Sequence, residues 1–450
     1  MLRKFRGISI LIIDVISVVS IFSVVYNLRL KEYPDYLSLD LWLIAFTVIS
    51  TLFISGTYVK GQHTNLPRLP IRTFFICAIS GLICTFWVYL LGPSEFNKYF
   101  GRGVLPLSIL LIGIMATITR YLVNSLHLRQ EKGIEFLYIG FSASGEAFIE
   151  ELKSHSDVRS VSVLCRRQPE CSNENIQFFD INDTKRILAK DWHSIVIDPQ
   201  HHSDRYETQQ LISKRLSGTP VQTLAEYYEL NWYMVPLNHI GDDWFLRTHG
   251  FSMLGHPISK RLKRITDIVL SILVFTMSLP ALLLCCILIK MTSKGPILFK
   301  QSRVGLQGNI FNIYKLRTMI QNAEPNGAQW AQNNDPRITK VGNFLRKSRL
   351  DEIPQCLNVL RGEMSFVGPR PERPEFTKEL SKKIPYYELR HMVKPGITGW
   401  AQVIFPYGAS VNDAMRKLQY ELYYIKNQSL LLDFNIMLRT LITIFQRAGR

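Results

Sequence analysis

Residues 265–291 read ITDIVLSILVFTMSLPALLLCCILIKM, an apolar stretch long enough to enter a membrane but interrupted in its middle. Basic residues flank it on both sides: Lys260, Arg261, Lys263 and Arg264 precede it, and Lys294, Lys300 and Arg303 follow. Positive charges usually gather at one end of a spanning helix, and Ser278 with Pro280 breaks this one. The stretch therefore predicts a re-entrant helix that leaves the membrane on its side of entry. A tilted spanning helix is the alternative, and it would place the rest of the chain outside.

Apolar segments also occupy the first 126 residues, each near the ~20 residues that cross a bilayer as a helix: 8–28, 41–59, 73–91 and 104–123. Arg3, Lys4 and Arg6 place the N-terminus inside, because cytoplasmic loops carry an excess of Lys and Arg. Arg120 is assigned to an inside loop by the same argument, so four crossings put the chain after residue 126 in the cytoplasm. The first segment lacks a small-residue cleavage site and is expected to stay as an anchor. Asp14 within it is expected to face a neighbouring helix or the interface.

From residue 133 the pattern changes to alternating strands and helices, which is typical of a parallel α/β fold. Strands are expected at 135–140, 161–165, 194–198 and 220–224, with helices from 145, at 183–190 and at 204–216. Residues 133–235 therefore predict a Rossmann-like module, followed by a linker at 236–259. The first turn, GFSASG at 140–145, lacks the middle glycine of the dinucleotide-binding fingerprint, which favours a scaffold role over nucleotide binding.

The 450-residue chain has a formal net charge of +17, which favours an anionic partner such as a membrane surface or a phosphorylated substrate. A basic module with interleaved aromatic residues is lacking, so nucleic acid is not an expected partner. The seven cysteines form no C-x-x-C pair and no Cys/His cluster with zinc spacing.

Residues 345–361 read LRKSRLDEIPQCLNVLR and place Asp351 and Glu352 side by side. Pro354 suits the first turn of a helix and Gly362 its end, so both acids are expected at a helix N-terminus, where a charged cap explains them. Their surroundings favour a site, because glycine- and proline-rich motifs carry cations suited to phosphate binding. These cations are Lys315, Arg317, Arg346, Arg349 and Arg370. One acid can then ligate Mg²⁺ and the other attack phosphorus.

This constellation indicates phosphoryl-type transfer to a lipid at the membrane surface, with a purely stabilising salt-bridge network as the alternative. Residues 412–426 and 430–445 close the chain as expected helices. The second has a broad apolar face, which predicts a helix lying in the membrane interface or, in close competition, a core helix.

The stretch 260–450 resembles the bacterial sugar transferases, the polyprenol-phosphate phosphoglycosyltransferases with a single re-entrant membrane helix. The matching motifs occur in this order: KRITD at 263–267, Ser278 with Pro280, FKQSRVG at 299–305, YKLRTM at 314–319, LDEIPQ at 350–355, SFVGPRP at 365–371 and KPGITGWAQ at 394–402. The leading apolar segments and the α/β module look like the large form of the family, which starts exopolysaccharide, capsule or O-antigen synthesis.

The resemblance implies a role for each matching residue. Asp351 would attack the β-phosphorus of a UDP-sugar and expel UMP, and Glu352 would hold Mg²⁺ against the diphosphate. Undecaprenyl phosphate would then take the sugar phosphate from the aspartyl intermediate. Phosphate binding would fall to Lys315, Arg346 and Arg370, with Arg317 and Arg303 as weaker candidates. Ser278 and Pro280 would form the re-entrant break, and Lys263, Arg264 and Asp267 would anchor its entrance.

The protein implied is a multi-pass protein of the bacterial inner membrane, with a mostly helical catalytic domain at 260–450 on the cytoplasmic face. Its expected partners are a UDP-sugar, undecaprenyl phosphate and membrane lipids, and assembly as a homo-oligomer is left open. Glucose is the expected sugar and galactose the alternative. A nucleotide-sugar dehydratase fits less well, because the chain lacks an intact glycine-rich turn and a Y-x-x-x-K motif. A non-enzymatic scaffold of polysaccharide assembly would leave the C-terminal motifs without a purpose.

Overall fold

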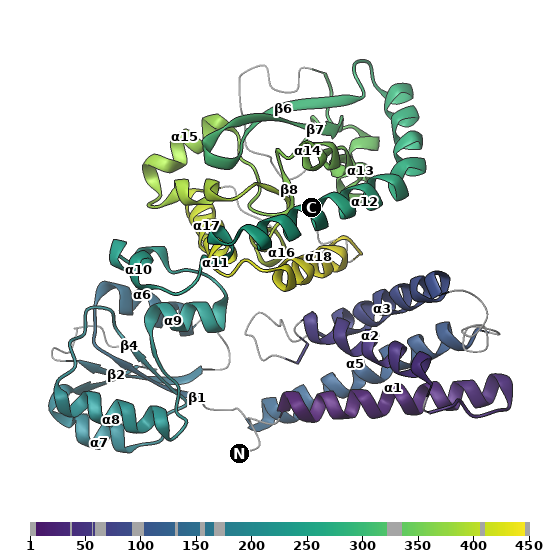
Figure 1. Ribbon diagram of the computed structural model, residues 1–450. Coiled ribbons are helices and arrows are strands. Elements are labelled where there is room, and N and C mark those ends of the chain that lie inside the picture. Colours follow the sequence, from purple (N-terminus) through teal and green to yellow (C-terminus); the bar gives the residue numbers. More distant parts are fainter. Residues whose placement is uncertain are drawn as a thin grey trace. The chain divides into compact units, whose positions relative to one another are not determined.

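The computed structural model describes residues 6–36, 38–55, 57–58, 69–91, 103–130, 134–153, 158–165, 176–321, 335–405 and 410–445. The fold is mostly helical, with several apolar helices and a five-stranded parallel sheet (Figure 1). The chain divides into two compact units, one of Met1–Arg120 with Gly250–Arg450 and the other of Tyr121–His249. Arg3 and Lys4, two of the cations used to predict the orientation, lie outside the described residues, and the orientation stays a prediction.

The N-terminal helices are α1 (Arg6–Leu30), α2 (Leu39–Ile54), α3 (Leu69–Leu91) and α5 (Val104–Gln130). Of the helices described, α1, α5 and α12 (Pro257–Thr292) are long and apolar enough to cross a membrane. The helices α2 and α3 contain shorter apolar segments, Leu41–Ile54 and Thr73–Trp87. Buried side chains such as Phe22, Val48 and Ile76 belong to one hydrophobic cluster.

Asp14 faces a neighbouring helix, as the sequence predicts. Arg120 of α5 donates to both of its carboxylate oxygens, at 2.9 and 2.7 Å, and Tyr58 donates to Oδ2 at 2.6 Å. The assignment of Arg120 to an inside loop is wrong, because this residue lies within α5 and is only 2% exposed. The error has a physical cause: counting Lys and Arg near helix ends cannot tell a loop cation from one that neutralises a buried carboxylate.

The unit Tyr121–His249 is built on a parallel sheet with the strand order β3-β2-β1-β4-β5. Its strands are β1 (Ile134–Ile139), β2 (Val158–Cys165), β3 (Ile176–Asp180), β4 (Ser194–Ile197) and β5 (Val221–Thr223). The helices between them are α6 (Ala143–Lys153), α7 (Thr184–Ala189) and α8 (Arg205–Leu216). Strand β3 was not expected, because the short stretch IQFFD lacks a clear alternation of apolar and polar residues.

Asp198, just after β4, occupies the turn that follows β1. Its Oδ2 accepts hydrogen bonds from Tyr138 OH at 2.8 Å, from Ser142 Oγ at 2.6 Å and from Ser142 N at 3.2 Å. Its Oδ1 accepts from Gln200 N at 2.8 Å. Gly140, with φ of +95°, leaves no room for a side chain, because an added Cβ would lie 2.7 Å from Asp198 Cβ. The donors of this turn therefore bind a carboxylate of the chain itself.

The stretch predicted as a linker contains short helical elements instead. They are η4 (Leu237–His239), α10 (Asp242–Arg247) and α11 (Ser252–Gly255). Helix α9 (Leu224–Tyr227) and η3 (Tyr228–Trp232) precede this stretch. Helix α12 also begins earlier than predicted, at Pro257 rather than near residue 265. Proline is well suited to the first turn of a helix, and this signal at Pro257 was missed.

Helix α12 is a single helix by its hydrogen bonds, with Ser278 and Pro280 inside it. Figure 1 shows that its axis bends sharply and that the second limb leads up to β6 (Leu298–Val304). Apolar side chains remain exposed along it, for example Val269 at 58% and Ile287 at 57%. A proline in a helix interior is a recognised cause of such a bend, and an exposed apolar surface of this length suits a lipid environment.

The rest of this unit combines short strands with helices packed around the polar motifs. A hairpin of β6 and β7 (Ile310–Leu316) is followed by α13 (Lys340–Ser348), η6 (Leu350–Gln355), α14 (Cys356–Arg361), β8 (Ser365–Val367) and α15 (Pro374–Lys383). Then come η7 (Tyr387–Met392), β9 (Gly396–Thr398), α16 (Trp400–Ile404), α17 (Val411–Lys426) and α18 (Leu430–Phe445). One face of α18 is in the core, where Ile436 is fully buried, while Leu431 stays 68% exposed. This partial burial favours the core position for that face.

Candidate active site

The segment that carries Asp351 and Glu352 forms a tight turn between two helices. Arg349, with φ of +58°, ends α13, and η6 then leads into α14. Pro354 lies within η6 and Gly362, with φ of +84°, closes α14, so the predicted start and stop of the helix are confirmed to within two residues. The backbone of η6 therefore places both acids just before the first residue of α14.

Three cationic side chains contact Glu352, two of them through Oε1. Its Oε1 accepts from Lys315 Nζ at 2.8 Å and from Arg370 Nη2 at 2.6 Å, and its Oε2 lies 3.4 Å from Arg349 Nη1. Burial by itself would raise the pKa of Glu352, but Arg370, Lys315 and Arg349 outweigh burial and hold that pKa well below its usual range. Burial lowers the pKa of Lys315, and the attraction of Glu352 opposes this shift. Glu352 is therefore an ionised acid surrounded by phosphate-binding side chains.

Asp351 differs from its neighbour. It is 7% exposed, and its Oδ1 has no hydrogen-bond partner among the described residues. Burial, followed by repulsion from Glu352, raises the pKa of Asp351 to about 6, against the opposing effect of Lys315, Arg346 and Arg349. A carboxylate oxygen that is buried yet unbonded is uncommon, and it is free to act as a nucleophile.

The predicted phosphate-binding cations separate into two groups. Lys315 and Arg370 lie on Glu352, and Arg349 joins them. Arg317 instead donates to Ser293 O at 2.9 Å and to Ser293 Oγ at 2.8 Å. Arg317 therefore binds Ser293 at the end of α12, whereas the hydrogen bonds of Glu352 come from Lys315, Arg349 and Arg370.

Two further predicted cations occupy fixed positions beside the site. Arg346 donates from Nε to Thr318 Oγ1 at 3.0 Å, and α13 approaches so closely that a Cβ on Gly342 would lie 1.9 Å from Thr318 O. Arg303 donates to Pro371 O at 3.1 Å and to Gln301 Oε1 at 2.7 Å. The side chain of Arg303 therefore contacts the backbone of the loop that carries Arg370.

The motifs SFVGPRP and KPGITGWAQ support each other directly. Strands β8 and β9 pair in parallel, with Ser365 opposite Gly396 and Val367 opposite Thr398. A Cβ on Gly396 would lie 2.1 Å from Gly368 N, so glycine is required at this contact. The motif KPGITGWAQ therefore packs against the loop that carries Arg370.

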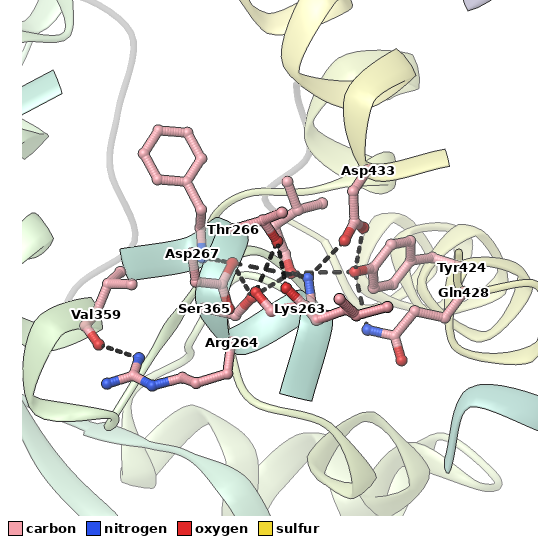
Figure 2. Close-up of polar contacts among 12 residues, drawn as sticks. Lys263, Arg264, Thr266, Asp267, Val359, Ser365, Tyr424, Gln428 and Asp433 are labelled. Atoms are coloured by element: carbon pink, nitrogen blue, oxygen red, sulfur yellow. Dashed lines mark hydrogen bonds and ion pairs between the residues drawn. The ribbon is translucent and has the colours of Figure 1, made fainter. Parts of the chain in front are cut away.

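Figure 2 shows the predicted anchor of α12. Lys263 donates to Asp433 Oδ2 at 2.7 Å and to Val367 O at 3.1 Å, while Asp267 Oδ1 accepts from Ser365 Oγ and Phe366 N, both at 3.0 Å. The guanidinium of Arg264 donates to the carbonyls at the end of α14, Val359 O at 2.6 Å and Leu360 O at 2.9 Å. These bonds join the first limb of α12 to β8 and α14, next to the site.

Sequence reasoning missed the partners of this anchor on the last two helices. Tyr424 of α17 donates to Asp433 Oδ1 at 2.8 Å and to Val367 O at 3.1 Å. The signal available was Asp433 itself, an acid in the first turn of an otherwise apolar helix. An acid in such a place usually has a buried partner.

The pair of acids has oxygen atoms suited to Mg²⁺, although no group of three metal-binding side chains gathers among the described residues. Glu352 Oε2 has one long contact of 3.4 Å and is the oxygen that could take the ion, while Asp351 Oδ1 is left for the substrate. Mg²⁺ commonly uses one or two carboxylates and completes its shell with water and substrate phosphates. The residues therefore fit a magnesium ion that arrives with a phosphorylated substrate.

The sequence pattern of bacterial sugar transferases matches residues 258–447. A glucose-1-phosphate transferase of Caulobacter vibrioides that acts on UDP-glucose and undecaprenyl phosphate is 43% identical over 180 residues, which cover 40% of this chain and 67% of that protein. The chain belongs to the bacterial sugar transferase family. In this family, an N-acetylgalactosaminephosphotransferase of Aeromonas hydrophila is 42% identical over 234 residues, or 52% of this chain.

The chain's match spans about half the length of that Aeromonas relative, 54%. An undecaprenyl-phosphate galactose phosphotransferase of Salmonella typhimurium is 26% identical over 447 residues, covering 91% of this chain and 89% of that protein. The names of these family members share undecaprenyl phosphate and differ in the sugar.

Proposed function

We propose that this protein transfers a hexose 1-phosphate from a UDP-sugar to undecaprenyl phosphate and releases UMP. The observation that carries the proposal is the contrast within the pair of acids: Asp351 Oδ1 lacks a partner among the described residues, while Glu352 is held by cations. Family membership supports the choice of substrates, because the relatives are named for undecaprenyl phosphate and a sugar phosphate.

In the first step, Asp351 Oδ1 forms a bond to the β-phosphorus of the UDP-sugar. The bond from that phosphorus to the bridging oxygen breaks, and UMP leaves with the electron pair. Lys315, Arg346 and Arg370 bind the phosphate oxygens and stabilise the charge that develops on them. The product on the enzyme is an acyl phosphate that links Asp351 to the sugar phosphate.

In the second step, a phosphate oxygen of undecaprenyl phosphate attacks the same phosphorus. The Asp351 carboxylate leaves, and undecaprenyl-diphosphate-hexose forms. We propose that Glu352 holds Mg²⁺, which would neutralise charge on the diphosphate when bound. A re-entrant α12 would bring the lipid phosphate to the site, as the exposed apolar side chains of the bent helix suggest.

The test is transfer of label from UDP-[¹⁴C]glucose to lipid in membranes supplied with Mg²⁺ and undecaprenyl phosphate. We expect label in the organic phase and none with Asp351→Asn, while Asp191→Asn, an exposed change in the sheet unit, keeps wild-type transfer. Transfer by Asp351→Asn would exclude this residue as the nucleophile. UDP-galactose and UDP-N-acetylgalactosamine, tested in parallel, decide the donor, for which UDP-glucose is our proposal.

For the membrane part, we propose that α1, α2, α3 and α5 cross the inner membrane and that α12 enters and leaves on the cytoplasmic side. Single cysteines at His256 and Lys294, both exposed and at either end of α12, should then react only with a reagent on the cytoplasmic side. Labelling from opposite sides would establish a spanning helix. The parallel sheet unit would serve as a Rossmann-like scaffold on that side, since Asp198 fills its first turn.

A further inference from the structure

The loop between β8 and α15 carries Arg370, and its backbone is held along its whole length. The carbonyls of four successive residues each accept a hydrogen bond from another segment: Pro369 from Gly396 N at 2.8 Å, Arg370 from Arg390 Nη2 at 2.8 Å, Pro371 from Arg303 Nη1 at 3.1 Å, and Glu372 from Val304 N at 3.0 Å. Proline has no N–H, so carbonyls are the groups by which neighbours can fix Pro369 and Pro371. The direction of the Arg370 side chain depends on these bonds.

Arg390 supplies the bond nearest to the site. Its side chain is 5% exposed, and Nη2 also donates to Glu421 Oε1 of α17 at 2.9 Å. Nη1 donates to Tyr387 OH, and the guanidinium lies 5.0 Å from the centre of the Tyr387 ring. The guanidinium is rigid, because Nη2 holds Arg370 O and Glu421 while Nη1 holds Tyr387, so both arms of the planar fork are fixed.

We infer that Arg390 is a positioning residue for the transfer reaction: held by Glu421 and Tyr387, it fixes the main chain of Arg370 so that the Arg370 guanidinium meets Glu352 Oε1 at 2.6 Å. Within the described part of the chain, the hydrogen bonds of Arg390 go to Tyr387, Glu421 and Arg370 O, so Arg390 acts on the two acids through Arg370. The inference rests on the proposed function, because it gives Arg370 a phosphate to bind.

Loss of this bond should disturb the reaction more than the binding of the lipid. A shift of the Arg370 backbone moves a charge that faces the donor's diphosphate, and misplacement by about 1 Å can cost about 100-fold in rate. The acceptor lipid enters the reaction only after UMP has left. We therefore expect a lower kcat/KM for the UDP-sugar, with kcat/KM for undecaprenyl phosphate unchanged.

The first variants remove the guanidinium in two ways. Arg390→Met leaves Glu421 as an unpaired buried charge and can unfold the protein, so the variant that decides is Arg390→Met with Glu421→Met, which removes both charges together. Arg390→Lys keeps a charge near Glu421, but one nitrogen cannot reach all three partners. Arg247→Met, which removes an exposed arginine paired with Asp243, is the matched control.

For the full-length protein in lipid nanodiscs, we expect kcat/KM for the UDP-sugar to fall by about 10- to 100-fold in the double variant. Losses of this size are typical when a residue that orients a ligand-binding side chain is removed. Arg390→Lys should recover part of this loss, and Arg247→Met should match the wild type. The decisive comparison adds the same double change to Arg370→Ala. If Arg390 acts through Arg370, the double change should lower kcat/KM of the Arg370→Ala protein by less than about threefold.

Hydrogen exchange supplies a readout that does not need activity. The amides that hydrogen-bond at this loop, those of Val304, Gly368 and Gly396, should exchange faster in the double variant, while those of α15 and α18 keep their wild-type protection. Wild-type kinetics in the double variant, unchanged exchange in the loop, or a full multiplicative loss on top of Arg370→Ala would each overturn the inference. A wild-type protein that transfers no sugar phosphate would refute the proposed function, and loop exchange would then decide whether Arg390 holds Arg370.

Discussion

Asp198 and Asp351 are both buried aspartates, 2% and 7% exposed, but their hydrogen bonds differ. Three donor atoms meet Asp198 Oδ2 and a fourth meets its Oδ1. Asp351 Oδ1 has no partner among the described residues, although cations surround the neighbouring Glu352. Burial alone therefore does not mark a reactive acid. What distinguishes Asp351 is an oxygen left unpaired next to cations that a substrate phosphate can occupy.

The two sites also use donors in opposite ways. In the sheet unit, the turn at Gly140 binds an internal carboxylate, so its donors are already used. In the candidate active site, Lys315 and Arg370 bind Glu352 and leave Asp351 available. An unpaired buried polar group costs about 1–3 kcal/mol, and proteins tend to retain such groups where they serve a function.

Among the changes that test the comparison of Asp198 with Asp351, Glu352→Gln should have the largest effect on the transfer rate. The amide oxygen can still accept a hydrogen bond but carries no charge, so Lys315 and Arg370 lose the charge that orients them for phosphate and the proposed Mg²⁺ loses its carboxylate ligand. We expect kcat to fall by about 10²–10³-fold, the loss seen when one preorganised electrostatic group is removed. Initial rates of UMP release measure it. Glu379→Gln, on an exposed ion pair with Lys383, should not change the rate; a wild-type rate in Glu352→Gln would mean that the cations need no such partner.

The pH profile of kcat/KM tests the raised pKa of Asp351. The carboxylate must be ionised to attack phosphorus, so activity should be present above pH 6 and fall about tenfold per pH unit below it. Burial and repulsion from Glu352 cause this shift. In Glu352→Gln the repulsion is absent, so the acidic limb should move to lower pH. If the acidic limb of the pH profile stays at the same pH in Glu352→Gln, burial alone raises the pKa of Asp351.

Local backbone features were predicted from the sequence better than the partners of the charged side chains. Pro280, Pro354 and Gly362 act locally on the backbone, so their effects could be read from the chain. The bond of Arg317 to Ser293 could not, because it depends on where the second limb of α12 ends relative to β7. Lys315 and Arg317 are two positions apart on one stretch of chain, and only the packing around them decides which one meets Glu352.

The same reasoning explains what was missed elsewhere. Asp433 lies on α18 and meets Lys263 only through the tertiary fold, and Tyr424 of α17 in turn bonds to Asp433. Arg120 was read as a topology signal because its partner Asp14 is 106 residues away. Long-range polar pairing is the part of this protein that local patterns did not specify.

Asp198→Asn tests the other side of the comparison and should affect stability rather than turnover. The amide keeps one acceptor but brings an NH₂ group toward donors that need an acceptor. The free energy of opening β1 and β4 should fall by about 1–3 kcal/mol. Hydrogen exchange of residues 134–145 and 194–201 in the full-length protein measures it, with Asp191→Asn as the exposed control. Loss of transfer in a folded Asp198→Asn protein would show that this carboxylate is more than structural.

Ser142→Ala should give the smallest effect, and its size decides how the turn is held. The hydroxyl donates to Asp198 Oδ2 at 2.6 Å, the shortest of the bonds to that oxygen. Removing it leaves Tyr138 OH and Ser142 N on the same oxygen, so the carboxylate stays satisfied and the cost should be about 0.5–1.5 kcal/mol. The same exchange measurement applies, and Ser217→Ala, which removes an exposed hydroxyl bonded to Lys214 O, is the control. A loss as large as that of Asp198→Asn would mean that the carboxylate depends on this one donor, and the two aspartates would then differ in degree rather than in kind.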